Sequence, residues 1–332
     1  MHDSYQKTSA TPSARCARGT TMGRMRLALV TTSWPAHDHD PAGHFVRSDA
    51  QALERAGHEV VVVSPAAGGA FGWPGAAARI RERPLRAWAA SRWIASTRAL
   101  VSKLKVDRIV AHWAVPSGWP IATGSSVEID LVSHGGDVRL LVALPKFVRW
   151  HLVFLLGARA REWVFASADL LHQLLETLDD RTRRCVERAA CVRAPPLDMI
   201  DVGADVAHLR RFLGEARIAV CVGRLVPKKR VDRVIEWAAR ERSIDILVVV
   251  GDGPERRSLE RLSRARNTQV RFVGAVDRRR ALTWIGAADV LVHASEAEGL
   301  SCVLREAERL GTSVVRLSAP PGASNDQRSG LR

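Results

Sequence analysis

Short, nearly continuous runs of aliphatic residues recur along this chain and are separated by longer segments with helical spacing. The runs lie at residues 26–31, 59–64, 108–112, 129–133 and 163–166, and again at 218–222, 244–250, 270–273 and 290–294. Continuous rather than alternating hydrophobicity is typical of parallel strands that are covered on both faces. We therefore predict a parallel sheet in each half of the chain.

Helical patterns fill the gaps between these runs. The clearest lie at residues 45–56, 231–242, 254–266, 277–286 and 301–310. Gly57 directly follows the first of them, where a glycine commonly ends a helix. Two successive series of alternating strands and helices predict an α/β chain with two Rossmann-like domains, which bind ligands at the carboxyl ends of their strands.

The same pattern sets the expected domain boundaries. We predict a flexible N-terminal extension, a first domain, a linker rich in Pro, Gly and Asp, a second domain and a disordered tail, at residues 1–24, 25–195, 196–215, 216–317 and 318–332 respectively. One apolar stretch, residues 140–164, is interrupted by Arg and Lys. It is interpreted first as a core helix and second as a surface that lies on a membrane.

The charge of the chain changes this picture only in part. The formal net charge is +15 over 332 residues. Two explanations stay open: a GC-rich genome, which yields an Arg- and Ala-rich chain, or a basic surface for nucleotide diphosphates or anionic lipid. Nucleic acid is disfavoured, because aromatic residues are 5% of the chain and no recognition motif occurs. Residues 109–127, the longest uncharged stretch, contain Pro and Gly and so do not predict a membrane-spanning helix.

A basic motif follows the first strand of the second domain. Gly223 allows a close backbone approach, Arg224 offers a fork of donors to phosphate, and Lys229 adds a mobile charge. Lys228 and Lys229 are the only lysines in the C-terminal half, which otherwise uses Arg. These residues together suit a diphosphate, whereas the alternative is an ordinary basic loop before a solvated helix.

An acidic motif follows the last strand of the expected second domain. Glu298, Gly299 and Leu300 stand in a loop, and Glu306 lies two turns inside the next helix. A helix N-terminus attracts an anion, and the two carboxylates could hold hydroxyl groups on either side of it. The alternative is an amphipathic helix with two solvated carboxylates.

The order of these motifs resembles the family 4 retaining glycosyltransferases of the GT-B fold. It runs G-R-x-x-x-x-K, G-D-G-P at 251–254, F-V-G at 272–274, and E-G-L with a second Glu eight residues on. The resemblance covers residues 26–315 and implies two facing Rossmann-like domains, with the acceptor on the first and the nucleotide-sugar donor on the second.

The resemblance also implies roles for the motif residues of the second domain. Arg224 and Lys229 would hold the donor diphosphate, Glu298 would contact the donor sugar, and Glu306 would hold the ribose hydroxyls. Backbone N–H groups of Gly299 and Leu300 would face the phosphate. Arg230 departs from the family, which usually has Gly there. Two outcomes stay open: its Cβ tightens the turn, or an αR backbone at this residue avoids the crowding.

The first domain matches the family in two loops. The segment 40–46 would bring Gly43 close to the sugar and phosphate. The segment 133–137 resembles H-G-x-D, so that His134 would line the reaction centre and Asp137 would belong to the donor site. A lone His at the end of a strand is, as an alternative, a structural residue.

Metal and cofactor requirements follow from the same resemblance. The segment 37–40, His-Asp-His-Asp, superficially resembles a metal site, but the family binds no metal there. We therefore expect no metal and no cofactor, with a nucleotide diphosphate sugar as donor substrate. The family also continues beyond Val315 with a Gly-Gly-x-x-Glu segment and a closing helix, which this sequence lacks. The second domain is accordingly expected to be incomplete at its C-terminus.

The implied activity is that of a hexosyltransferase-type enzyme. It would move a sugar to a hydroxyl of a glycan or lipid-linked acceptor, with retention at the anomeric carbon, in cell-envelope glycolipid or polysaccharide synthesis. No secretory signal occurs, so the expected location is cytoplasmic, with peripheral contact at the inner face of the plasma membrane. The alternatives are a nucleotide-sugar epimerase of the same fold and an inactive, truncated glycosyltransferase.

Overall fold

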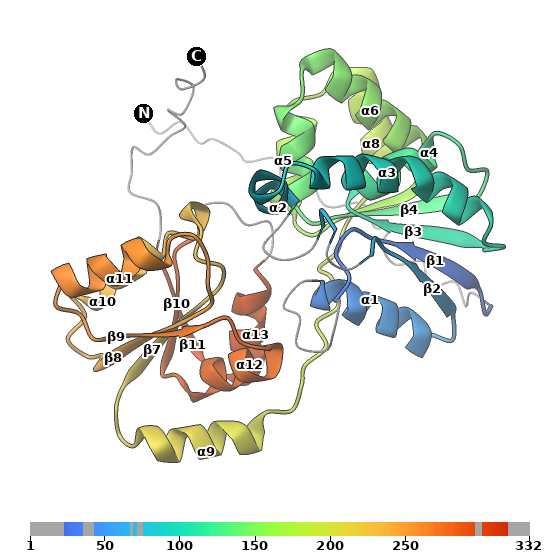
Figure 1. Cartoon of the computed structure of the whole chain (residues 1–332). Coiled ribbons are helices and arrows are strands. Elements are labelled where there is room, and N and C mark those ends of the chain that lie inside the picture. Colours follow the sequence, from blue (N-terminus) through green and yellow to red (C-terminus); the bar gives the residue numbers. More distant parts are fainter. Residues whose placement is uncertain (1–22, 36–42, 67–68, 72–75, 296–300, 318–332) are drawn as a thin grey trace, which may run out of the picture. The chain divides into compact units, whose positions relative to one another are not determined.

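The fold comes from a computed structural model, which describes residues 23–35, 43–66, 69–71, 76–295 and 301–317. The chain divides into two compact units, one made mainly of the residues up to Pro196 and the other mainly of those from Leu197 onward. Each is an α/β unit around one parallel sheet, which confirms the predicted α/β class with two Rossmann-like domains. Figure 1 shows the elements of both units.

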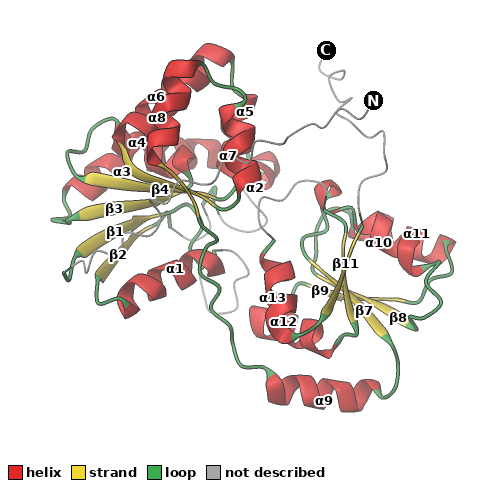
Figure 2. Ribbon diagram, turned by 180° about the vertical axis from the view of Figure 1, so that it is seen from behind, coloured by secondary structure: helices red, strands yellow, loops and turns green. Residues whose placement is uncertain are grey.

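The first unit contains a six-stranded parallel sheet in the order β2-β1-β3-β4-β5-β6. Its strands are β1 (Arg26–Val30), β2 (Glu59–Val63), β3 (Arg108–His112), β4 (Glu128–Ser133), β5 (Ala160–Phe165) and β6 (Ala190–Val192). Its α-helices are α1 (His44–Arg55), α2 (Ala76–Glu82), α3 (Arg86–Ser102), α4 (Trp119–Ala122), α5 (Gly136–Ala143), α6 (Lys146–Arg159), α7 (Ala168–Leu175) and α8 (Asp180–Ala189). In both Figures 1 and 2, α1 covers one face of this sheet, while α3 and α6 lie on the other.

The second unit contains a five-stranded parallel sheet in the order β11-β10-β7-β8-β9. Its elements are α9 (Gly203–Leu213), β7 (Ile218–Val222), α10 (Val231–Ala238), β8 (Ile246–Val250), α11 (Arg256–Ala265), β9 (Val270–Gly274), α12 (Arg278–Ala287), β10 (Val290–His293), α13 (Cys302–Leu310) and β11 (Ser313–Arg316). Residues of α10 and α11 pack on one face of the sheet, and residues of α12 and α13 pack on the other. The central strands are thus buried on both sides, which explains their continuous hydrophobic runs.

Two segments differ from the sequence-based expectation. Residues 140–164 form no single helix: Pro145 separates α5 from α6, and the last residues enter β5. The expected linker 196–215 contains α9, which packs against α12, with the Val206 side chain close to Gly286. Residues 203–213 therefore belong to the second unit, because their apolar side chains find a partner that the local composition does not reveal.

The tail 318–332 and all but the last residues of the extension 1–24 lie outside the described residues. Within the described part of the chain, no helix combines the length and the apolar character needed to span a bilayer.

Candidate functional site

The basic motif of the second unit lies where the strand order of its sheet reverses. The first strand, β7, lies between β8 and β10, so the loops that leave β7 and β10 depart at a topological switch point. Open parallel sheets bind their ligands beyond the carboxyl ends of the strands at such a point. The loop after β7 carries Gly223, Arg224 and Lys229.

Glycines bring two backbone segments of this loop region into direct contact. A Cβ at Gly251, where φ is 138°, would lie 1.9 Å from the Gly223 carbonyl oxygen. A Cβ at Gly253 would lie 2.4 Å from the carbonyl oxygen of Leu225. The Leu225 N–H donates to the Asp252 carbonyl at 3.0 Å. The backbone of the G-D-G-P turn therefore packs directly against the backbone of the G-R loop, and only glycine permits so short a distance between them.

Lys229 is the central cation of this loop. Its side chain lies over Gly223, whose added Cβ would stand 3.7 Å from the lysine Cε. Burial, together with the positive charges of Lys228 and Arg224, lowers the pKa of Lys229 to about 8. The structure thus brings Gly223, Arg224 and Lys229 together. A bound anion would offset the repulsion between the positive charges there.

Arg230 has a left-handed backbone where the family usually has Gly. Of the two outcomes left open for this residue, the structure does not adopt the αR backbone: φ is 48° and ψ is 45°, the left-handed region. The residue ends the short 3₁₀ turn Pro227–Lys229 and precedes α10, so the chain must reverse there. Its guanidinium pairs with Asp232 at 3.0 Å. Arg230 therefore occupies the glycine-like conformation at a cost of about 1–2 kcal/mol.

Glu306 lies on α13 and is 6% exposed. Its Oε1 atom is 3.1 Å from Nε of Arg278, the first residue of α12. Burial raises the pKa of Glu306, and the charge of Arg278 opposes that rise. The Arg278 Nη2 atom is buried and has no hydrogen-bond partner among the described residues. Sequence reasoning missed Arg278, because nothing in the chain links two residues 28 positions apart.

Some predicted site residues cannot be placed. Glu298, Gly299 and Leu300 lie outside the described residues, as does the segment 37–40. Gly43 is described and has φ 73°, directly before α1. In the described part of the chain, no group of three or more His, Cys, Asp or Glu could hold a metal ion.

Asp137 shapes the loop after β4 in the first unit. One carboxylate oxygen accepts from the Ser133 hydroxyl at 2.7 Å and from the Ala114 N–H at 2.9 Å. The other accepts from the N–H groups of His134 and Gly135, at 3.3 and 3.1 Å. Burial raises the pKa of Asp137, and these donors oppose the rise. Both oxygens are therefore engaged by donors from the loop after β4 and from Ala114, which follows β3, a positioning role that the sequence did not predict.

His134 stands between aromatic rings at the same loop. The ring centroids of Phe45 and Trp113 are 4.7 and 5.0 Å from that of the histidine. Trp113 has φ 65°, a strained conformation for a large residue, and such strain clusters at functional sites. Sequence reasoning missed a second histidine, His112, whose Nδ1 is 2.9 Å from Nε2 of His134. The signal available for it was a polar residue ending an apolar strand.

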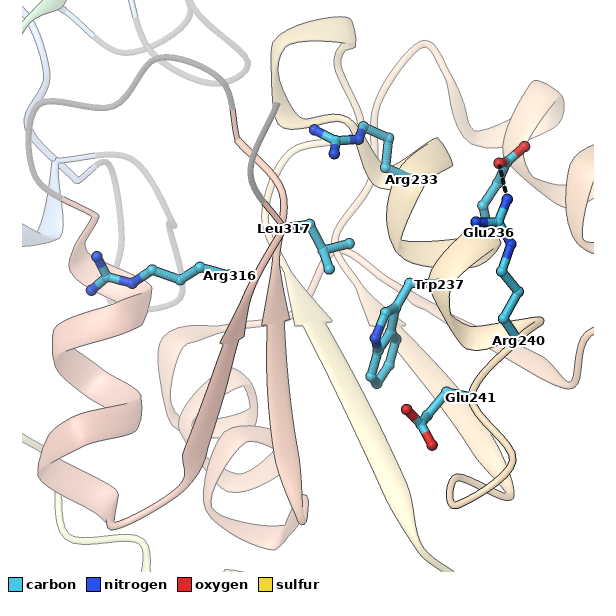
Figure 3. Close-up of a pocket in the computed structure, with 7 residues that line it drawn as sticks. All are labelled: Arg233, Glu236, Trp237, Arg240, Glu241, Arg316 and Leu317. Carbon is cyan, nitrogen blue, oxygen red and sulfur yellow. Dashed lines mark hydrogen bonds and ion pairs between the residues drawn. The ribbon is translucent and has the colours of Figure 1, made fainter. Parts of the chain in front are cut away.

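The second unit also has a cavity of about 410 Å³, which lies apart from the predicted donor-site residues. The side chains that line it come from α10, from the residues just after α10, and from the end of β11 and the residue that follows it: Arg233, Glu236, Trp237, Arg240, Glu241, Arg316 and Leu317. In Figure 3, Leu317 and Trp237 form its apolar part, and Glu236 pairs with Arg240. None of the predicted site residues lines this cavity, so it adds nothing to the donor site.

The comparisons with known proteins decide the nature of the second unit. Residues 210–324 match the family described as "Glycosyl transferases group 1". The chain carries a glycosyltransferase group 1 domain. This match contains Gly223, Arg224, Lys229 and Glu306, and so covers the motifs that carried the resemblance.

Two curated relatives bear glycosyltransferase names. D-inositol 3-phosphate glycosyltransferase 2 of Catenulispora acidiphila is 36% identical over 132 residues, which are 35% of this chain and 31% of the relative. TuaC of Bacillus subtilis, named as a teichuronic acid biosynthesis glycosyltransferase, is 27% identical over 219 residues, 63% of this chain and 52% of the relative. The chain thus spans about a third and about half of the length of these two relatives.

Solved glycosyltransferase structures share the fold. Sucrose-phosphate synthase from Thermosynechococcus elongatus matches with a TM-score of 0.66 and 21% identity, over 88% of this chain and 81% of that one. The Anabaena protein HepE, solved in complex with UDP and glucose, matches with a TM-score of 0.58 and 17% identity, over 88% and 80%. At this level of identity the likeness shows the fold, which agrees with the two parallel sheets described above.

Proposed function

We propose that this protein transfers a sugar from a nucleotide diphosphate sugar to a hydroxyl acceptor, with retention at the anomeric carbon. The observation that carries the proposal is the position of Lys229 over Gly223 at the end of β7, beside Arg224. Burying a lysine among other cations is costly, and a bound diphosphate repays that cost. The group 1 domain and the solved neighbour with bound UDP and glucose support the same ligand class.

The proposed chemistry is electrostatic. Arg224 and Lys229 neutralise the charge that develops on the leaving diphosphate, and donors that are already in place do this at little reorganisation cost. Glu306 holds the ribose hydroxyls, Glu298 contacts the sugar, and Gly299 and Leu300 offer backbone N–H groups to the phosphate. With these cations in place, the transfer is proposed to need no metal, and undiminished turnover in EDTA is the expected result.

The acceptor is proposed to be a glycan or a lipid-linked intermediate of envelope polysaccharide or glycolipid synthesis, handled in the cytoplasm. The name of one relative, which refers to teichuronic acid biosynthesis, supports this assignment. So does a surface around the start of α6: Phe147 is 79% exposed, Leu140 and Val148 are each 47% exposed, and residues 139–161 contain Arg and Lys but no Asp or Glu. Exposed apolar side chains among basic ones suit peripheral contact with an anionic membrane.

This membrane contact has its own test. The chain should sediment with vesicles that contain anionic lipid and should stay in solution with neutral ones. Phe147→Glu should weaken the sedimentation, because it places a charge on the exposed apolar surface. Equal sedimentation of the variant and the wild-type chain would remove this part of the proposal.

Calorimetric titration with UDP- and GDP-sugars tests the donor site. Binding is expected for the wild-type chain, and Lys229→Ala and Glu306→Ala should abolish it. Lys103→Ala, at the end of α3 in the first unit, is the matched control and should bind as the wild type does. A folded wild-type chain that binds none of these donors would overturn the proposal.

Product analysis then tests the reaction class. An acceptor screen with NMR detection of the anomeric proton should show a product with the donor's anomeric configuration. Conversion of the donor into a second nucleotide sugar without any acceptor would identify an epimerase instead. Binding without turnover would indicate an inactive glycosyltransferase.

A further inference from the structure

Three polar side chains from three elements form a chain in the first unit. Asp49 lies on α1, His112 ends β3, and His134 follows β4. Figure 1 labels these three elements. The Asp49 Oδ2 atom is 3.0 Å from Nε2 of His112, and the His112 Nδ1 atom is 2.9 Å from Nε2 of His134. β1 and β3 flank the topological switch point of this sheet, because β1 is followed by β2 on one side and the chain then crosses to β3 on the other. The carboxyl ends of β1 and β3 therefore lie beside each other where such sheets bind ligands.

The positions of the protons follow from the carboxylate. A carboxylate beside Nε2 of His112 favours a proton on that nitrogen, although the contact is electrostatic rather than a well-aligned hydrogen bond. A neutral His112 then has a bare Nδ1, which can only accept. His134 must therefore donate from its Nε2, and this leaves its own Nδ1 bare.

The surroundings hold this arrangement in place. His112 is fully buried, and its ring stacks against that of His134 with centroids 5.1 Å apart and planes 11° from parallel. The rings of Phe45 and Trp113 also pack against His134. Burial and the neighbouring His112 keep the pKa of His134 well below its usual value, so the ring is neutral at pH 7. His134 still keeps part of its surface exposed, where a ligand can reach it.

We propose that Asp49 and His112 are positioning residues that hold His134 with its proton on Nε2, so that Nδ1 accepts a hydrogen bond from a sugar hydroxyl. This inference rests on the proposed function for its ligand, but the proton order itself does not. The opposite order, with His134 protonated on Nδ1, would present a donor to the sugar and is a separate outcome of the test.

NMR of the chain labelled with ¹⁵N-histidine measures the proton order directly. The chain has 11 histidines, so His112→Gln and His134→Gln spectra assign the two rings. The His134 Nδ1 atom is expected to resonate as an unprotonated nitrogen and Nε2 as a protonated one. A protonated Nδ1 in the wild-type chain would overturn the proposal, with no variant and no activity required.

Asp49→Asn tests the role of the carboxylate. The amide can donate to His112 Nε2, which would move the His112 proton to Nδ1 and reverse the order at His134. We expect kcat/KM for sugar transfer to fall by about 10- to 100-fold, because the bare Nδ1 is lost. UDP affinity should stay unchanged, since Lys229 and Glu306 lie in the second unit. Glu54→Gln, an exposed carboxylate on the same helix, is the control and should leave both quantities unchanged.

The outcomes separate the two proposals. Unchanged proton order and unchanged kcat/KM in Asp49→Asn would overturn the positioning role while leaving the proposed function intact. Failure of the wild-type chain to bind any nucleotide sugar would overturn the proposed function, whereas the NMR result would still decide the proton order. If Asp49→Asn does not fold, the wild-type spectrum decides by itself.

Discussion

Glu306 and Arg278 form an ion pair inside the second unit, with 3.1 Å between the carboxylate Oε1 and the guanidinium Nε. Their side chains are 8% and 15% exposed respectively, so water solvates neither charge well. A ribose held by Glu306 must therefore share the carboxylate with Arg278. The pair joins α12 to α13 and holds the carboxylate in one orientation before any ligand arrives.

Removing the arginine alone should be costly. Arg278→Met leaves a buried carboxylate without its partner, and we expect a loss of about 3–5 kcal/mol in the free energy of unfolding. The double variant Arg278→Met/Glu306→Met should recover most of that loss, because an apolar pair replaces the ion pair. Urea unfolding of the two variants measures both values. Equal stability of single and double variants would show that the pair is not coupled.

Nucleotide-sugar binding should depend on pH through Lys229. The free side chain has a pKa of about 8, and a bound diphosphate must raise that pKa because it favours the charged form. Binding then takes up a proton as the pH approaches and passes 8. Affinity should be constant below that pH and fall by up to about tenfold per unit above it. Calorimetry at pH 7, 8 and 9 in buffers of different ionisation enthalpy measures both the affinity and the proton uptake; a pH-independent Kd would contradict the assignment.

Arg230 allows a test of backbone strain. Arg230→Ala and Arg230→Gly both remove the pair with Asp232, and they differ only in the Cβ. Since φ is 48°, the glycine variant should be more stable than the alanine variant by about 1 kcal/mol. At most positions the order is the reverse, because glycine gives the unfolded chain more conformational freedom. Thermal or urea unfolding of the two variants gives the difference. An alanine variant as stable as the glycine variant would mean that the turn relaxes to another conformation.

Asp137 should prove to be a residue of the loop rather than of the ligand site. Asp137→Ala leaves the Ser133 hydroxyl and three N–H groups without their acceptor in a buried position. We expect a loss of about 3 kcal/mol or more in unfolding free energy. Affinity for UDP, measured under conditions where the variant is folded, should stay near that of the wild type. A stable variant that no longer binds a nucleotide sugar would restore the donor contact implied by the resemblance.

Local pattern was sufficient for the strands and for the basic motif. Buried parallel strands are continuously apolar, so the apolar runs between residues 26 and 294 predict strands even when the neighbouring strands are unknown. Gly223, Arg224 and Lys229 are also close in sequence, so one short loop must bring them together. The confirmed fold class and the group 1 domain follow from these local signals.

Tertiary structure alone decided the pairings between distant residues. The pairs Arg278–Glu306 and His112–His134 exist because strand order and helix packing bring their elements together, and periodicity within one element carries no information about that. The same reason explains why Asp137 turned toward its own loop and why Arg230 took a left-handed backbone. Composition and spacing set which residues are buried and which are near one another along the chain, while the packing of parallel βα units sets which polar groups meet.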